Sequence, residues 1–150
     1  MLKMKRKASS RGYSLIEVLV ACVVLSLSIL GFAGLQITGL TSNKVAMSRS
    51  QASIQAYSII DSMRANRSAA TAYVRTIGAA TPSGTSRADV DVSTWLGNLK
   101  KQLPSGDGSI SATLTDPSNP TTSTYTITVV VQWTESRSST SSQLSVNTQI

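Results

Sequence analysis

An apolar run that carries one acidic residue is the strongest constraint on the fold of this chain. The run extends from Leu15 to Leu40, and Glu17 is its only charged residue. As a helix its 26 positions would span roughly 39 Å, which exceeds the ~30 Å hydrocarbon core of a bilayer. The run therefore predicts a helix that spans a membrane.

Glu17 is costly in such a helix. A carboxylate at the centre of a bilayer costs roughly 2.5–3.5 kcal/mol or more, so we expect a cation to pair with Glu17 if it lies inside the membrane. The alternative is that Glu17 lies at the membrane interface and its carboxylate reaches water. Both interpretations place this residue at the start of the spanning helix.

A basic leader precedes the apolar run. Five of the 14 Lys and Arg residues lie before Gly12, and the remaining nine basic residues against seven acidic ones leave a net charge of +2. The basic excess is therefore typical of a targeting signal, and we expect no nucleic-acid partner. By the positive-inside rule, we expect the N-terminus in the cytoplasm and the body in the periplasm.

The composition lacks the residues that most catalytic and metal sites use. Cys22 is the only cysteine, and the chain has no histidine. An intramolecular disulfide is impossible, and the commonest general base and metal ligand is missing. We therefore predict that the protein is not an enzyme and that it uses no cofactor, no metal and no small-molecule substrate.

Three processing routes fit a basic leader followed by an apolar run. In the first, a signal peptidase cleaves at the small residues of Gly31–Ala33, although such apolar cores are usually shorter and carry no carboxylate. In the second, Leu19–Cys22 acts as a lipobox and Cys22 is lipidated. In the third, cleavage follows Gly12 and leaves the whole apolar helix on the mature protein.

The stretch from Gly12 to Ala21 resembles the class III signal of type IV prepilins. The shared features are a glycine, an aromatic residue, a small hydroxyl residue, two aliphatic residues and a glutamate that enter a long helix. The match is continuous and includes Glu17, which favours the third route. Tyr13 departs from the pattern, because phenylalanine is commonest there, but it keeps the aromatic ring.

The resemblance implies a role for three residues. Gly12 is expected to be the last residue of the leader, 1–12, which a membrane prepilin peptidase removes. Tyr13 is expected to become the new N-terminus and to be N-methylated. Glu17 is expected to take part in subunit assembly by neutralising the terminal amine of an adjoining subunit, which is the cation that a buried carboxylate needs.

Beyond the apolar run the hydrophobic spacing stays helical. We predict one helix from Ser14 to Arg67, with a transmembrane and assembly half at 13–40 and an amphipathic half at 41–68. One apolar stripe contains Val45, Ala52, Ala56, Ile59 and Met63, and a second contains Leu40, Met47, Ile54 and Tyr57. We expect the first stripe to carry the globular body and the second to meet neighbouring helices. The alternative is that both stripes lie under one small domain.

Residues 69–150 are predicted to form a periplasmic globular region. A loop is expected over 69–87, in which Tyr73-Val74 is compatible with a short helical turn. A second helix is expected over about 89–103, with Asp89 or Asp91 as its N-cap. Alternating apolar residues then predict an antiparallel sheet of three or four strands within about 109–150. The predicted strands are 109–114, 124–134 and 143–150, and polar turns at 105–108, 116–122 and 136–142 separate them.

This order of elements is of the α+β class and resembles the type IV pilin fold, a long N-terminal α-helix on a small C-terminal antiparallel β-sheet. Within that family the chain is more similar to the minor pilins called type IV pilus modification protein PilV. The lack of paired C-terminal cysteines disfavours a major subunit with a disulfide-closed loop. The PilV-like residues are 17–21, 31–36, 63–67, the Trp95 helix ending at Leu103-Pro104, the turn 106–108 and 129–133.

Four groups of residues outside the signal are candidates for ligand binding. Each also has a structural interpretation, which we favour: helix capping for two acids, a solvated helix end for two lysines, core packing for two tryptophans and a solvated loop for a serine-rich stretch. The groups are Asp89 with Asp91, Lys100 with Lys101, Trp95 with Trp133, and residues 136–142.

Three functions are compatible with these features. The first is a minor pilin that primes or caps a type IV pilus, with roles in twitching motility, adhesion or DNA uptake. The second is a minor pseudopilin of a type II secretion system, and the third is a membrane-anchored periplasmic binding or adhesion module that never polymerises. The expected partners are the inner membrane, the prepilin peptidase and other minor and major pilins. The expected location is the inner membrane before assembly and the pilus tip afterwards.

Overall fold

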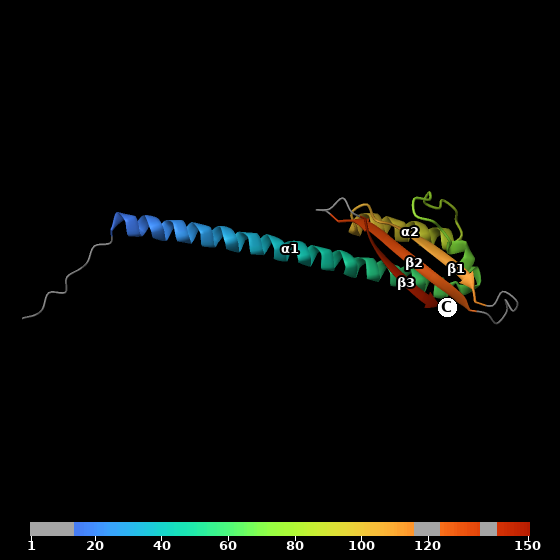
Figure 1. The fold of residues 1–150 in the computed structure, drawn as a ribbon. Coiled ribbons are helices and arrows are strands. Elements are labelled where there is room, and N and C mark those ends of the chain that lie inside the picture. Colours follow the sequence, from blue (N-terminus) through green and yellow to red (C-terminus); the bar gives the residue numbers. More distant parts are fainter. Residues whose placement is uncertain (1–13, 116–123, 136–140) are drawn as a thin grey trace, which may run out of the picture. The chain divides into compact units, whose positions relative to one another are not determined.

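The chain forms a long N-terminal helix followed by a small α+β region (Figure 1). The structure is a computed structural model that describes residues 14–115, 124–135 and 141–150. Two compact units divide the chain, one up to Ser42 and one from Asn43. The predicted α+β class and type IV pilin fold are confirmed. The elements in order are α1 (Leu15–Ala65), η1 (Arg67–Tyr73), α2 (Arg87–Gln102), β1 (Asp107–Leu114), β2 (Tyr125–Thr134) and β3 (Ser141–Gln149).

The first helix ends close to the predicted boundary. α1 stops at Ala65, and Arg64 in its last turn suits the negative end of the helix dipole. The loop predicted over 69–87 is wrong for its first part, because η1 continues as a 3₁₀ helix to Tyr73. Ala70 and Tyr73 are buried, so tertiary packing orders a segment whose sequence shows no helical period.

The sheet is antiparallel throughout, with the strand order β1-β2-β3. In the middle row Val129 of β2 lies opposite Ile110 of β1 and Val146 of β3. The predicted alternation in β2 is confirmed, because its inner side chains from Ile127 to Trp133 are buried while the outer ones are only half-buried. A fourth strand is not present among the described residues.

Two strands begin earlier than predicted. β1 starts at Asp107 and β3 at Ser141, within segments predicted as polar turns. Both extensions pair with the long β2: Asp107 lies opposite Gln132, and Ser141 lies opposite Thr134. The pairing partner decides these boundaries, because the local composition of both segments favours a turn.

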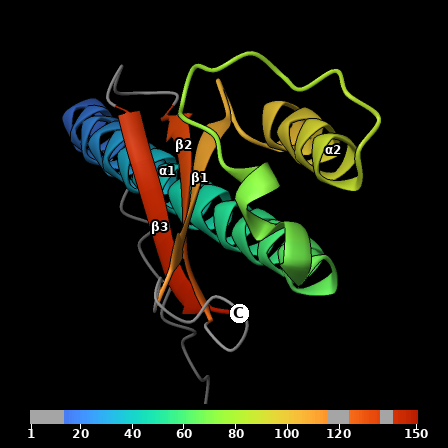
Figure 2. The same cartoon turned by 90° about the vertical axis from the view of Figure 1, so that its right-hand side faces the viewer.

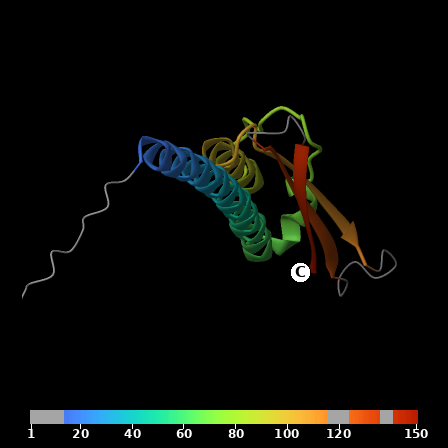
Figure 3. The same ribbon diagram turned by 60° about the vertical axis from the view of Figure 1, so that its left-hand side comes forward.

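The core forms where α1, α2 and η1 meet the inner face of the sheet. Figure 3 shows the C-terminal part of α1 and α2 on the same side of the sheet. Trp95 is buried in this core, and its indole N–H donates to the backbone carbonyl of Gln55 at 2.9 Å, which ties α2 to α1. The largest fully buried side chains are Trp133, Tyr73, Ile59, Ile60, Met63, Leu96, Leu99, Leu103, Ile110, Ile127, Val92 and Val129.

The N-terminus of α2 is capped by Ser86 and not by the predicted Asp89 or Asp91. The Ser86 hydroxyl accepts a hydrogen bond from the Asp89 N–H at 3.1 Å, and it donates to the Asp89 carboxylate at 2.6 Å. The first of these bonds is an N-cap, because the hydroxyl satisfies one of the free N–H groups of the first turn, and the helix starts at Arg87. The prediction was wrong because it placed the cap at an acid that belongs to the first turn.

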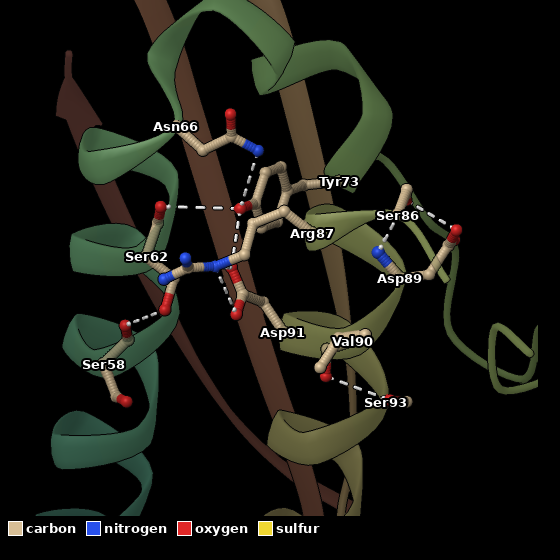
Figure 4. Close-up of polar contacts among 10 residues, drawn as sticks. All are labelled: Ser58, Ser62, Asn66, Tyr73, Ser86, Arg87, Asp89, Val90, Asp91 and Ser93. Carbon is tan, nitrogen blue, oxygen red and sulfur yellow. Dashed lines mark hydrogen bonds and ion pairs between the residues drawn. The ribbon is translucent and has the colours of Figure 1, made fainter. Parts of the chain in front are cut away.

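A polar cluster joins the end of α1, η1 and α2 (Figure 4). The Tyr73 hydroxyl donates to the Asp91 carboxylate at 2.7 Å and accepts from the Asn66 amide at 3.3 Å. Arg87 Nε donates to the same carboxylate at 3.1 Å. Burial is the main cause that raises the pKa of Tyr73; the hydrogen bond from Asn66 opposes the rise, and Asp91 adds to it. Tyr73 therefore stays a protonated donor across the physiological pH range.

An ion pair fixes the start of β1. Arg75 Nη1 lies 2.9 Å from Asp107 Oδ1, and it also donates to the Gly108 carbonyl at 2.8 Å. Burial by itself raises the pKa of Asp107, but hydrogen bonds from the Gly78 and Gly108 N–H groups and from Arg75 outweigh it, so the pKa lies below its ordinary value. The Arg75 backbone also exchanges two hydrogen bonds of 2.9 Å with Ile110 on the outer side of β1.

Gly108 and Gly97 make a matched pair for testing how tightly α2 packs on the sheet. A Cβ at Gly108 would lie 2.5 Å from Trp95 and 2.8 Å from the Val130 carbonyl oxygen, whereas a Cβ at Gly97 in α2 meets nothing within 4 Å. We expect Gly108→Ala to lower the free energy of unfolding by about 1–3 kcal/mol through overpacking. Gly97→Ala is expected to raise it by about 0.5–1 kcal/mol, since alanine favours a helix.

The measurement is urea unfolding of the full-length chain in detergent micelles, followed by tryptophan fluorescence. Equal midpoints for the two variants would show that Trp95 does not pack against Gly108.

Candidate functional site

The first half of α1 presents an apolar surface on every side. Its side chains from Leu15 to Leu40 are exposed, and none lies in the core of the chain. An 18-residue window in α1 has a mean hydropathy of 2.6 and is entirely unburied. Of the helices in the described part of the chain, α1 is the one long and apolar enough to cross a membrane.

Three hydroxyl side chains of this segment are compatible with lipid. Ser26 donates its hydroxyl hydrogen to the Cys22 carbonyl at 2.7 Å, and Ser28 donates to the Val24 carbonyl at 2.8 Å. Thr38 makes the same bond to the Gly34 carbonyl at 3.1 Å. Each hydroxyl is thus satisfied within the helix, which a hydrocarbon environment requires.

The glycines of this segment have no packing role inside the chain. A Cβ at Gly31, Gly34 or Gly39 would meet nothing within 4 Å. In membranes, small residues at helix surfaces allow another helix to approach closely. These three positions therefore leave room for a partner helix.

Glu17 lies in the first turn of α1. Its backbone N–H donates to the Ser14 carbonyl at 3.0 Å, and its side chain is exposed next to Val18 and Ala21. No ion pair involves Glu17 within the described ranges. The helix dipole favours an acid at this position, but the dipole alone does not replace a counter-ion in lipid. Gly12 and Tyr13, the predicted cleavage and methylation residues, lie outside the described residues.

The two predicted apolar stripes of α1 have different environments. Ala52, Ala56, Ile59 and Met63 of the first stripe are buried in the core. In the second stripe the exposed fractions are 64% for Met47, 58% for Ile54 and 54% for Tyr57. The prediction that the first stripe carries the globular body is confirmed, and the alternative that both stripes lie under one domain is wrong. The reason is that the sheet and α2 cover only one side of the helix.

A shallow groove continues the second stripe toward α2. It has a volume of about 360 Å³ and is lined mainly by apolar atoms. Met47 and Lys44 of α1 form one side, and Gln102 and Pro104 at the end of α2 form the other. The exposed apolar surface of α1 is therefore continuous from the stripe into this groove.

The other candidate ligand residues have structural partners or lie in the core. Asp89 accepts a hydrogen bond from the capping hydroxyl of Ser86, and Asp91 accepts one from the Tyr73 hydroxyl. Trp95 and Trp133 are buried, which confirms their core interpretation. Lys100 and Lys101 lie in the last turn of α2 and are exposed, as predicted.

The predicted polar loop at 136–142 lies mostly outside the described residues. Ser141 and Ser142 belong to β3, and the Ser142 hydroxyl donates to the Glu135 carboxylate at 2.8 Å. Residues 136–140 are not described. Within the described ranges, no group of three or more His, Cys, Asp or Glu side chains converges on a point where it could hold a metal ion.

Two polar contacts escaped the sequence prediction. The Arg75–Asp107 pair joins residues 32 positions apart, and Tyr73–Asp91 joins residues 18 positions apart. Nothing in the local sequence marks either pair. The Ser86-x-x-Asp89 pattern, in contrast, is a recognisable helix start, and it could have corrected the predicted N-cap.

Residues 7–33 match the family model described as the prokaryotic N-terminal methylation motif. The matched residues contain Gly12, Tyr13 and Glu17 and extend into the apolar part of α1. No curated protein and no solved structure matches the chain. The motif, together with the long helix and the three-stranded sheet, supports a protein of the pilin type, either a type IV pilin or a pseudopilin.

The two stripes of α1 can be separated by one substitution on each face. Ile54 is 58% exposed and Ile59 is 1% exposed on the same helix. We expect Ile54→Ser to change the free energy of unfolding by less than about 0.5 kcal/mol. Ile59→Ser is expected to lower it by about 2–5 kcal/mol, because it removes buried apolar volume and buries a hydroxyl.

The same urea titration in micelles measures both variants. A loss of stability in Ile54→Ser comparable with that of Ile59→Ser would mean that the second stripe is covered within the chain.

Proposed function

We propose that this chain is a minor pilin that primes or caps the assembly of a type IV pilus. The observation that carries the proposal is the prepilin-like signal at Gly12–Glu17, which leads into a membrane-length helix that the described part of the chain leaves exposed. A spanning helix that only anchored a domain would need neither the signal nor the acid. Both are useful if the helix is transferred from the membrane into a filament.

The proposed mechanism begins with removal of the leader. Prepilin peptidase cleaves between Gly12 and Tyr13, and the new amine of Tyr13 is methylated. The five cations of the leader are lost in this step, and a single cation is created four residues before Glu17. Charge pairing between Glu17 of one subunit and the terminal amine of its neighbour then offsets the cost of burying both groups.

Two surfaces of α1 support assembly. The glycine-bearing apolar half leaves room for close helix approach, and the exposed stripe at Met47, Ile54 and Tyr57 continues the apolar surface beyond the membrane. The inner membrane is thus the partner before assembly, and other minor and major pilins are the partners afterwards. The sheet and α2 pack on the face of α1 opposite this exposed stripe.

A role as a minor subunit is favoured over a role as a major one. The chain has a single cysteine, so it lacks the disulfide-closed C-terminal loop that many major pilins have. The order of short PilV-like segments along the chain points the same way. We therefore place the mature protein in the inner membrane before assembly and at the pilus tip after it.

A minor pseudopilin of a type II secretion system is the second candidate. The same signal, apolar helix and small α+β body serve that machine, and nothing in the body separates the two functions. Deletion of the gene distinguishes them: loss of surface pili supports a pilus, and loss of exoprotein secretion with normal pili supports a secretion system. A non-polymerising membrane module is the third candidate.

The processing site can be tested by intact mass measurement and N-terminal sequencing of the mature chain. We expect a chain that begins at Tyr13 with a methyl group on its amine, because the signal places the scissile bond after Gly12. Gly12→Val should leave the leader attached, since the peptidase requires a small residue there. A mature chain that begins at a lipidated Cys22, or after Ala33, would exclude the pilin-type proposal.

Glu17→Ala tests assembly separately from insertion. We expect the variant to insert in the membrane at the normal level but to enter sheared pili at least about tenfold less, because the partner amine is left buried without a counter-ion. Asp61→Ala is the matched control, since Asp61 is an exposed acid on the same helix that pairs only with Arg64. Immunoblots of membrane and sheared-pilus fractions measure both. Normal incorporation of Glu17→Ala would support the non-polymerising module instead.

A further inference from the structure

Among the described residues, no strand pairs with the outer side of β3, which is an edge of the sheet. Figure 2 shows it as the outermost strand, with β2 on its inner side. Tyr125 of β2 and Ile150 exchange two backbone hydrogen bonds of 2.9 and 3.0 Å. Bonded and non-bonded pairs alternate along an antiparallel ladder, so Leu144, Val146 and Thr148 bond to β2. The residues between them direct their backbone groups away from the sheet.

The outward row contains five residues. They are Ser141, Gln143, Ser145, Asn147 and Gln149. In the part of the chain that the structure describes, the backbone N–H groups of Gln143, Ser145 and Asn147 donate to no acceptor. The row therefore offers backbone donors and acceptors that repeat every second residue, roughly 7 Å apart along the strand.

One residue pair covers part of the opposite edge of the sheet. There the backbone of Arg75 pairs with Ile110 of β1 through both of its polar groups. The side chain of Arg75 is held in addition by Asp107. Within the described residues, the chain thus pairs one position on the outer side of β1 and none on the outer side of β3.

β3 also lacks the features that usually protect an edge strand. Folded proteins discourage pairing at edges with charged residues, prolines, bulges or very short strands. β3 is nine residues long, and its sequence SSQLSVNTQ contains no charge, no proline and no glycine. Its nine pairs with β2 run in continuous register without a bulge.

The side chains of β3 that face the core indicate which kind of side chain a partner strand would place beside them. Leu144 and Val146 are half-buried and pack against the core. An added strand would place its own alternate side chains beside them, on the face that the helices cover. A second copy of β3 would bring only two apolar side chains flanked by hydroxyls to this face, whereas a strand with apolar residues at every second position would bury more apolar surface.

We propose that β3 binds an extended segment of another protein as a fourth, antiparallel strand. The segment has apolar side chains at alternate positions. Main-chain hydrogen bonds to the outward row supply the binding, and the alternate apolar residues beside Leu144 and Val146 supply the register. The partner need not be a pilus subunit, so this proposal goes beyond the proposed function and can fail without affecting it.

A peptide titration with the full-length chain in micelles tests the proposal. The probe is a synthetic peptide of alternating threonine and valine with a lysine at each end, and amide hydrogen exchange is followed residue by residue by NMR. We expect the amides of Gln143, Ser145 and Asn147 to exchange at least about tenfold more slowly at saturation. The amides of Leu144 and Val146, which already bond to β2, should change little.

A peptide control and a protein control accompany this test. The same peptide, N-methylated at every second residue along its bonding edge, should give no protection. Ser145→Pro should abolish the effect, because it removes an outward N–H without breaking a bond to β2. Ala112→Pro is the matched variant, because the N–H of Ala112 also points away from β2, but on the opposite edge of the sheet. This variant should bind the peptide normally.

Three results would overturn the proposal. One is the absence of slowed exchange, and another is equal protection by the N-methylated peptide. The last is protection that grows with protein concentration without peptide, which would make a second copy of the chain the occupant. The slow exchange of Leu144 and Val146 verifies in each variant that the sheet is intact.

Discussion

The packing of one stripe of α1 against the sheet is the interaction on which the body of this protein depends. Ala52, Ala56, Ile59 and Met63 are fully buried and form the base of the only core cluster among the described residues. Because a small domain can bury only limited apolar surface, the loss of this stripe would leave the sheet and α2 without a common support.

The same helix carries two other surfaces that the body leaves open. Its first half is apolar on every side and makes its hydrogen bonds internally, which suits a lipid or a bundle of similar helices. Its second half exposes Met47, Ile54 and Tyr57 on the face opposite the core. The helix thus forms part of the core, and in the proposed function it also serves as anchor and assembly surface, with Glu17 at the end where the proposed change of environment begins.

The sequence predicted the parts of the structure that depend on period and spacing. The buried stripe of α1, the alternation in β2 and the core position of Trp95 and Trp133 are all confirmed, because each follows from a repeat of 3.6 or 2 residues. The N-cap of α2, the 3₁₀ helix η1 and the first residues of β1 and β3 were missed. The N-cap is local and could have been recognised from Ser86-x-x-Asp89, whereas η1 and the two strand starts depend on a partner segment far away in sequence, which no local period reports.

The sequence by itself determined the end of the molecule on which the proposed function rests. The leader, Gly12, Tyr13, Glu17 and the apolar run are contiguous, and their chemistry requires only a helix and a membrane. Only the tertiary structure decided which stripe of α1 is buried, how Arg75 pairs with one edge of the sheet and that no described strand pairs with the outer side of β3. The physical reason is that burial and edge pairing depend on which segments meet in space. Backbone hydrogen bonds between strands involve no side chains, so the composition of a strand does not reveal them.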